Sequence, residues 1–298
     1  MNDTLFMTTL NSPLLKLEGR SGCKLEVVNR DGVFFVKKIA KEENYNNRLL
    51  LQAQKQQHYY QCESSVDFKA PCVLQQSTDI ESLTWFEMPY LHGQKYSEFF
   101  ERATVPEIKE LANKFNGYFK SSFEKATLAK VDPAHFSLKL RAVQKLLSGR
   151  TDINLNLLQH VIGYLEIIPE DSIPLRPCHG DFTFSNMLFC ADGIYLVDFL
   201  DSFVESPLID LVKFRQDTFF YWSLLIENQL PESRSAKVIQ IFNYLDGQVY
   251  SNFANNKFVK EWYNYLQVFN LLRILPYVYQ KEEIEFVQKS IQRIIPIS

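Results

Sequence analysis

Hydrophobic and polar positions in the first ninety residues are arranged as in short strands with turns between them. Strands are predicted at residues 14–18, 24–29, 33–39 and 83–88. The second and third are joined by a segment containing Asp31-Gly32, a pair that suits a tight hairpin turn. One apolar-striped stretch, residues 44–60, is predicted to be a helix. The N-terminal part is therefore predicted to be a small sheet with one helix.

Beyond residue 93, apolar side chains recur at steps of three and four, the spacing of amphipathic helices. The clearest stripe runs from Val105 to Phe119, and further helices are predicted at residues 136–147, 154–168, 219–228, 238–253 and 261–279. We therefore predict an α+β protein with two lobes. A β-rich lobe would span residues 1–90 and a larger, mainly helical lobe residues 91–298, with a ligand between them.

Composition and charge narrow the class of protein. The chain has 298 residues, of which 46% are hydrophobic and 22% charged, and 32 basic against 35 acidic residues leave a net charge of −3. This balance creates no field for a polyanion, so no nucleic-acid partner is expected. We also expect no signal peptide and no membrane helix. The five cysteines lack a CxxC spacing, which favours reduced thiols in a cytoplasmic protein.

The segment from Cys178 to Phe199 contains the residue types that phosphoryl transfer needs. A carboxylate must orient the attacking hydroxyl, and oxygen ligands must hold magnesium on the phosphates. His179-Gly180-Asp181, with Asn186 five positions after the aspartate, has the spacing of the protein-kinase catalytic loop, with Gly in place of Arg. In that loop the aspartate is the base and the asparagine is a metal ligand.

A predicted hairpin supports this interpretation. Its turn would be residues 191–193, between strands 187–190 and 194–197, so Asn186 and Asp198 lie equally far from Asp192. Cross-strand neighbours have Cβ atoms roughly 5 Å apart, close enough to share one cation. The alternative is that Asp198 is an ordinary strand-end residue and that His-Gly-Asp occurs by chance.

These motifs resemble the aminoglycoside phosphotransferase and choline kinase-like family, which shares the protein-kinase fold. The resemblance is sharpest over residues 178–199 and extends more loosely from about Leu15 to about Trp222. It implies an enzyme that uses ATP and Mg²⁺, with Asp181 as catalytic base. Asp210 is expected to support the catalytic loop. The amino-acid sequence of these motifs also resembles that of family members associated with bacterial surface-polysaccharide synthesis.

In the N-terminal lobe the resemblance suggests residues that bind the phosphates of ATP. Ser21 and Gly22 would lie in a phosphate-cradling turn, although a plain hairpin turn is the alternative. Lys37 and Lys38 point to opposite faces of one strand. Similarity favours Lys37 as the lysine that contacts phosphate, which would leave Lys38 as a solvated surface residue.

The predicted helix lacks the glutamate that usually pairs with this lysine in the kinase fold. Gln52 could substitute for it, the lysine could be held in another way, or activity could be reduced.

The segment around Pro89 resembles the interlobe hinge of this family, where backbone groups bind adenine. Proline has no N–H, so the Tyr90 N–H and the carbonyls of Glu87 and Met88 would be the available groups. The alternative is an ordinary strand-to-helix connection.

The expected acceptor is a hydroxyl of a small molecule. Only residues 200–206 follow the Asp198-Phe199 pair before the next element, too few for a segment that docks a peptide. By resemblance, acceptors include aminoglycosides, choline, ethanolamine, amino acids and sugars. Asp201, Glu205 and Asp217 are expected to be solvated by default, or else to recognise a cationic or polyhydroxyl substrate.

Two other classes of protein compete with the enzyme. One is a pseudokinase that binds nucleotide or a protein partner without transferring phosphate, which the missing helix glutamate favours. The other is a helical interaction protein in which the motif occurs by chance. This alternative does not explain why Asn186 and Asp198 lie opposite each other in the predicted hairpin.

Overall fold

The structure is a computed structural model, and it describes residues 15–17, 22–77, 82–226 and 231–295. The chain divides into two compact units. The first comprises residues 1–94 and 188–201, and the second comprises residues 95–187 and 202–298. A segment from the middle of the chain therefore belongs to the N-terminal unit.

The first unit contains a five-stranded sheet in the order β1-β2-β3-β6-β5, and its neighbouring strands are antiparallel. The strands are β1 (Leu15–Leu17), β2 (Cys23–Arg30), β3 (Val33–Ala40), β5 (Gln75–Gln76) and β6 (Trp85–Pro89). Between β2 and β3, Asp31 and Gly32 have φ angles of 53° and 84°, the two positive values that a two-residue hairpin turn requires. The predicted hairpin is confirmed.

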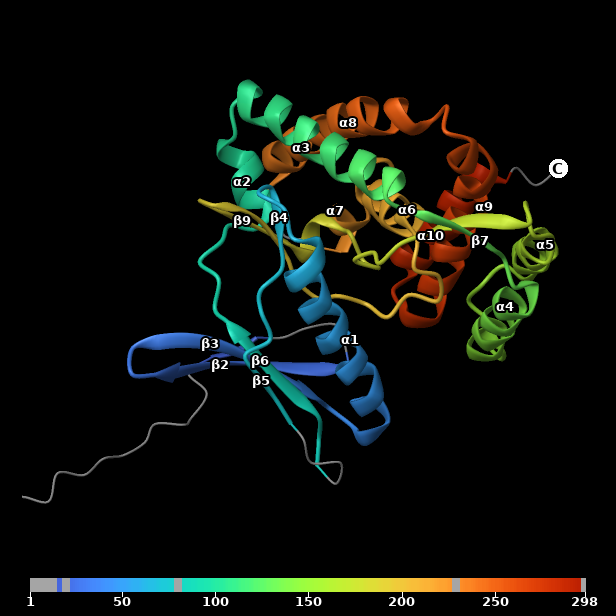
Figure 1. Ribbon diagram of the computed structural model, residues 1–298. Coiled ribbons are helices and arrows are strands. Elements are labelled where there is room, and N and C mark those ends of the chain that lie inside the picture. The colour runs from blue at the N-terminus through green and yellow to red at the C-terminus, as the bar shows by residue number, and fades with distance from the viewer. Residues whose placement is uncertain (1–14, 18–21, 78–81, 227–230, 296–298) are drawn as a thin grey trace, which may run out of the picture. The chain divides into compact units, whose positions relative to one another are not determined.

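Helix α1 (Asn46–His58) packs on this sheet (Figure 1). A 3₁₀ turn (Glu43–Tyr45) precedes the helix and a π turn (Tyr59–Glu63) follows it. The shared core consists of Cys23, Val36, Ala40, Leu49, Ala53, Phe86 and Met88. A small sheet with one helix, as predicted for the N-terminal part, is therefore what forms.

A second, three-stranded sheet joins the middle segment of the chain to the first unit. Its order is β4 (Phe68–Lys69), β10 (Gly193–Leu196), β9 (Met187–Cys190), with β10 parallel to β4. Gly193 has a φ of 143°, and a Cβ there would lie 3.0 Å from the Val66 carbonyl oxygen. The positive φ would strain any other residue and the close approach adds to this strain, so glycine is favoured here. The turn predicted at residues 191–193 accordingly connects β9 and β10.

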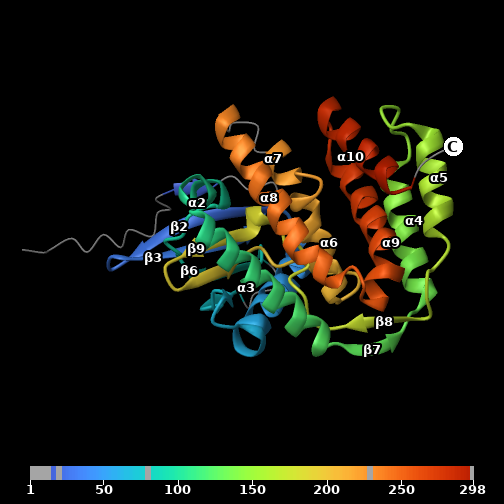
Figure 2. The same ribbon diagram turned by 90° about the horizontal axis from the view of Figure 1, so that it is seen from above.

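The second unit is mainly helical. Its helices are α2 (Tyr96–Arg102), α3 (Val105–Glu124), α4 (Pro133–Leu147), α5 (Leu155–Leu165), α6 (Pro207–Thr218), α7 (Trp222–Ile226), α8 (Glu232–Phe253), α9 (Lys257–Ile274) and α10 (Lys281–Ile294). Two short strands, β7 (Thr127–Lys130) and β8 (Ser172–Leu175), pair antiparallel. Helix α3 packs on α8, and α9 lies beside α10 (Figure 2). Helix α6 contacts α3, α8 and α9, so nearly all of its side chains are buried.

The predicted helices agree with this arrangement except at several ends. Helix α3 begins at a capping box formed by Thr104 and Glu107 and runs five residues beyond the predicted stripe. Of the helix predicted at residues 219–228, the described residues form only Trp222–Ile226. The helix does not begin earlier because Tyr221 has a φ of 61°, and the chain turns there. Residues 227–230 lie outside the described residues. Helices α2, α6 and α10 were not placed by the sequence pattern.

No helix in the described part of the chain combines the length and hydropathy that crossing a bilayer requires.

Aromatic side chains form much of the core of the second unit. Phe100 is fully buried, and its ring centroid lies 5.9, 5.5 and 5.8 Å from those of Tyr96, Phe184 and Phe242. Trp262 is likewise buried.

Replacing Phe100 with alanine should remove a central part of this core. We expect Phe100→Ala to lower the free energy of unfolding by about 3–5 kcal/mol, from lost transfer energy and the cavity left behind. Urea unfolding followed by circular dichroism measures the change. Leu138→Ala is the matched control, since Leu138 is 65% exposed, and it should cost no more than about 0.5 kcal/mol. Equal effects of the two substitutions would contradict this description of the core.

Candidate active site

The His179-Gly180-Asp181 motif lies in the loop between β8 and β9. The loop ends in one 3₁₀ turn, Phe184–Asn186, and all of it belongs to the second unit. Gly180 has a φ of 84°, in the left-handed region that other residues rarely adopt. A glycine between the histidine and the aspartate is therefore what this backbone requires.

Asp210, in the first turn of α6, holds the start of this loop. Its Oδ2 accepts a hydrogen bond from the His179 N–H at 2.9 Å, and its Oδ1 accepts one from the Gly180 N–H at 2.9 Å. The Tyr118 hydroxyl donates to Oδ2 at 2.6 Å. Asp210 is 1% exposed, and these donors compensate the burial of its charge. Asp210 thus makes the supporting contacts expected of it.

Asp217, near the end of α6, holds the other end of the loop. Its Oδ2 accepts from the Phe184 N–H at 2.7 Å and its Oδ1 from the Ser223 N–H at 2.9 Å. Burial raises the pKa of the Asp217 carboxyl to about 6, although the hydrogen bonds from Phe184 and Ser223 lower it. The expectation that Asp217 is solvated is wrong, because the side chain is fully buried as a cap for two backbone donors.

Glu205 also binds the backbone. Its carboxylate accepts from the Cys178 N–H at 3.0 Å and from the Ser202 N–H at 3.3 Å. It is half-buried, whereas Asp201 is exposed as expected. Glu205 therefore contributes to the shape of the loop.

Two side chains bind the Asp181 carboxylate, and the Asp181 side chain is 24% exposed. The Asn186 amide donates to Oδ2 at 2.8 Å and to the Asp181 carbonyl at 2.9 Å. The Lys213 ammonium lies 3.0 Å from Oδ1. Burial acts to raise the pKa of Asp181, but the Lys213 ammonium and, more weakly, His179 and Asn186 bring the pKa below its ordinary value. The carboxylate is therefore held ionised, as a proton acceptor must be.

Lys213 was not among the residues predicted from the sequence. The signal that could have found it is helical spacing, because Asp210, Lys213 and Asp217 follow one another at steps of three and four on α6. All three side chains meet the same loop.

In the first unit it is Lys38 that contacts Asp198. The two form an ion pair, and the Lys38 ammonium also donates to Gln52 Oε1 at 2.9 Å. Burial alone would lower the pKa of Lys38, but the Asp198 carboxylate raises it above its ordinary value. Gln52, from α1, thus stands where the kinase fold is expected to supply a glutamate, and the substitution suggested by the sequence is the arrangement found.

The expectation that Lys38 is a solvated surface residue is wrong. Lys38 lies on the same face of β3 as the buried Val36 and Ala40 and is 3% exposed. Lys37 lies on the opposite face, with its ammonium 3.9 Å from the centre of the Trp85 ring. The structure therefore does not bring Lys37 to Asp198.

The hinge residues lie at the end of β6, and their groups are already engaged in the sheet. The Tyr90 N–H donates to the Phe34 carbonyl at 3.1 Å. The Glu87 carbonyl accepts from the Leu74 N–H at 2.8 Å, and both carboxylate oxygens of Glu87 bind the Arg30 guanidinium. A role for Glu87, Met88 and Tyr90 in nucleotide binding stays a prediction.

The phosphate-cradling turn is described only in part. Ser21 lies outside the described residues. Gly22 precedes β2, and a Cβ at this position would meet the Tyr45 ring at 2.6 Å. This close contact explains why a glycine stands at this position. A role for Gly22 in binding phosphate stays a prediction.

Asn186 and Asp198 have the chemistry of magnesium ligands. The Asn186 amide oxygen accepts no hydrogen bond from the described residues, and the Asp198 side chain is 38% exposed. Within the same described ranges, no cluster of three or more His, Cys, Asp or Glu side chains forms a ready-made metal site. Magnesium commonly takes only one or two protein ligands and completes its shell with waters and phosphates, and each of these residues carries an oxygen of the kind that magnesium takes.

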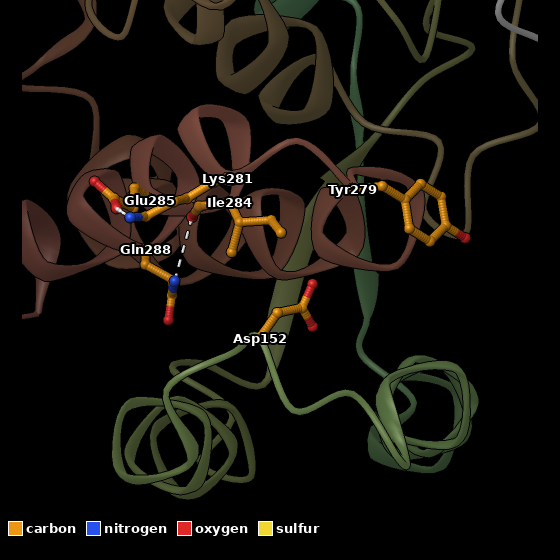
Figure 3. A pocket seen from close by; sticks show the side chains of 6 residues that line it. All are labelled: Asp152, Tyr279, Lys281, Ile284, Glu285 and Gln288. Atoms are coloured by element: carbon orange, nitrogen blue, oxygen red, sulfur yellow. Dashed lines mark hydrogen bonds and ion pairs between the residues drawn. The ribbon is translucent and has the colours of Figure 1, made fainter.

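A separate pocket of about 320 Å³ occurs in the second unit (Figure 3). Asp152, Tyr279, Lys281, Ile284, Glu285 and Gln288 line it. Asp152 is already bound at both oxygens by Arg150. None of the residues predicted to act in phosphoryl transfer belongs to this pocket.

Solved structures similar to this chain include phosphotransferases. A thermostable mutant of aminoglycoside phosphotransferase APH(4)-Ia has 14% identity and a TM-score of 0.59, with 94% of each chain covered. Spectinomycin phosphotransferase APH(9)-Ia has 12% identity and a TM-score of 0.51, covering 92% of this chain and 88% of that one. A putative fructosamine-3-kinase from Thermobifida fusca YX-ER1 has 14% identity and a TM-score of 0.50, covering 94% and 93%.

These similarities confirm the predicted protein-kinase-like fold, with a small β-rich part and a larger helical part. Among proteins with curated descriptions, none matches the chain. The family model described as the phosphotransferase enzyme family matches residues 18–230, which include every predicted site residue and most of the chain. The chain belongs to the phosphotransferase enzyme family.

Proposed function

We propose that this protein transfers the γ-phosphate of ATP to a hydroxyl group of a small molecule in a magnesium-dependent reaction. The observation that carries the proposal is the Asp181 carboxylate, held ionised between Asn186 and Lys213 on a loop that Asp210 and Asp217 fix at both ends. A partly exposed carboxylate with this support suits a base that accepts the proton of an incoming hydroxyl.

The remaining roles follow from the chemistry of the side chains. Asn186 and Asp198 would hold magnesium, which when bound would neutralise charge on the phosphates of ATP. Lys38 replaces Lys37 in our proposal as the residue that steadies the α- and β-phosphates, since it is the lysine beside Asp198. Gln52 would orient Lys38 through a neutral hydrogen bond.

The acceptor class is supported by the short segment after Asp198 and by the similar structures. APH(4)-Ia has been solved with ADP and hygromycin B, and APH(9)-Ia with ADP and spectinomycin. Those two ligands are polyhydroxylated small molecules. We therefore propose a sugar, amino alcohol or aminoglycoside-like acceptor for this chain.

The competing function is a pseudokinase that binds nucleotide or a protein partner without transfer. Gln52 favours it, because an amide holds Lys38 without the charge that a glutamate would add. The presence of Asp181 in addition to Asn186 and Asp198 favours the enzyme, since a carboxylate that accepts a proton would be dispensable in a scaffold that only binds nucleotide.

Transfer itself is the first test. Incubation with [γ-³²P]ATP and magnesium, against hygromycin B, spectinomycin, choline, ethanolamine and a set of monosaccharides, should label at least one acceptor. Labelling should disappear when EDTA removes the magnesium. Binding of AMP-PNP without labelling of any acceptor and without ATP hydrolysis would instead favour the pseudokinase.

The two neighbouring lysines should differ in their effect on nucleotide binding. Lys38→Ala should weaken the affinity for magnesium AMP-PNP at least about tenfold, because a charge-assisted hydrogen bond contributes about 1.5–3 kcal/mol. Lys37→Ala is the matched control on the opposite face and should change affinity less than about threefold. Isothermal titration calorimetry measures both. The reverse ranking would restore Lys37 to the phosphate-binding role.

Asp198→Ala should abolish the magnesium dependence of nucleotide binding. A ligand at about 100 times its dissociation constant stabilises the folded state by roughly 2.7 kcal/mol. We expect thermal unfolding of the wild type to show this stabilisation only with AMP-PNP and magnesium together, and Asp198→Ala to lose it. Asp192→Ala, which removes an exposed carboxylate in the same hairpin, is the control and should retain it. A full magnesium-dependent shift in Asp198→Ala would exclude Asp198 as a ligand.

A further inference from the structure

Lys213 is a largely buried cation beside the proposed base. Its side chain is only 12% exposed, and its ammonium lies 3.0 Å from Asp181 Oδ1. Burying an ammonium is costly unless its charge is paired and its N–H groups are bound. An exposed lysine that happened to meet an aspartate would carry no such constraint. The position of Lys213 therefore needs support from the surrounding helices.

That support comes from a buried hydrogen-bond chain between α6 and α9. The Lys213 ammonium donates to Gln216 Oε1 at 3.2 Å, and the Asn270 amide donates to the same oxygen at 2.8 Å. Gln216 is 3% and Asn270 5% exposed. Because Asn270 fixes the Gln216 oxygen, that oxygen offers the ammonium one defined position.

Lys213 and Asn186 together engage both oxygens of Asp181. Lys213 contacts Oδ1, and Asn186 donates to Oδ2. A carboxylate is planar, so two donors on different oxygens fix its rotation and leave the remaining lone pairs in set directions. The base must also work close to a phosphoryl group that carries negative charge, and the ammonium offsets the repulsion between that group and the carboxylate.

We propose that Lys213 is a positioning residue for phosphoryl transfer: it holds Asp181 Oδ1 in the orientation that accepts the acceptor's proton, and Gln216 and Asn270 hold Lys213. The proposal rests on the proposed function, because it assigns Lys213 a role through the base. It adds to the family motif a residue from α6 that lies outside the motif.

Substitution of Lys213 should separate turnover from nucleotide binding. Lys213→Met should lower kcat about a hundredfold, the effect expected when a catalytic group is misplaced, and should change the KM for ATP less than about threefold. Lys213→Arg keeps the cation and should recover kcat to within about tenfold of the wild type. Lys120→Met, on an exposed lysine of α3, is the control. Rates are measured with the best acceptor of the panel above and as magnesium-dependent ATP hydrolysis, with water as acceptor.

A double-mutant cycle distinguishes positioning from a structural role. If Lys213 acts through Asp181, then Lys213→Met should change the residual rate of Asp181→Asn less than about threefold. Thermal unfolding of each variant identifies one that fails to fold, and Lys213→Gln, which is polar and of similar length, then takes the place of Lys213→Met.

The outcomes separate this inference from the proposed function. A wild-type protein that neither labels an acceptor nor hydrolyses ATP defeats both. An active wild type whose kcat changes less than about threefold in Lys213→Met and Lys213→Gln overturns the role of Lys213 alone. The same holds if Lys213→Met slows Asp181→Asn by the full factor seen in the wild type.

Discussion

The candidate site depends on one interaction. The carboxylate of Asp210 accepts hydrogen bonds from two backbone N–H groups of the loop. These bonds fix His179 and Gly180, and so they fix the direction in which the chain presents Asp181. Asp217 acts in the same way at the other end of the loop, where it accepts a hydrogen bond from the Phe184 N–H. Each of these carboxylates is buried, and a backbone N–H left without its acceptor would cost about 1–3 kcal/mol. The loop therefore has one favourable conformation.

One face of helix α6 supplies all of these contacts, so a short segment of the chain determines how the loop is held. Its two aspartates hold the backbone of the loop, and Lys213, between them in sequence, holds the functional carboxylate. The first unit is organised around a different charge pair, Lys38 with Asp198, with Gln52 as a neutral third member. Each unit thus contains its own preformed group of the residues to which we assign roles in phosphoryl transfer.

Local sequence signals predicted the features that depend on neighbouring residues. The Asp31-Gly32 turn, the stripe of α3 and the spacing of Asp181 and Asn186 all belong to this group, because turn geometry, helical period and loop motifs are set within a few positions. Asp210 was found by resemblance, through the order of the motif. The sequence thus predicted the fold class, and the catalytic role of the loop stays a prediction.

Features set by tertiary packing were missed or misassigned. The strand residues Phe35 to Ala40 are apolar on both faces, so the pattern could not tell which of Lys37 and Lys38 faces inward; packing of Val36 and Ala40 on α1 decides it. Lys213 is linked to Asp181 only because α6 packs under the loop. The engagement of the Tyr90 N–H by Phe34 depends on how far β3 and β6 pair, which alternation does not reveal.

The most direct test of the account is a single-turnover comparison of the wild type with Asp181→Asn. Each protein is loaded with [γ-³²P]ATP, magnesium and the best acceptor, and its affinity for AMP-PNP is measured separately. The account predicts that the variant binds AMP-PNP with an affinity within about threefold of the wild type, yet transfers phosphate at least about a hundredfold more slowly, since a positioned base contributes about 10²–10⁴-fold. Transfer at a rate near that of the wild type would contradict the assignment of Asp181 as the base.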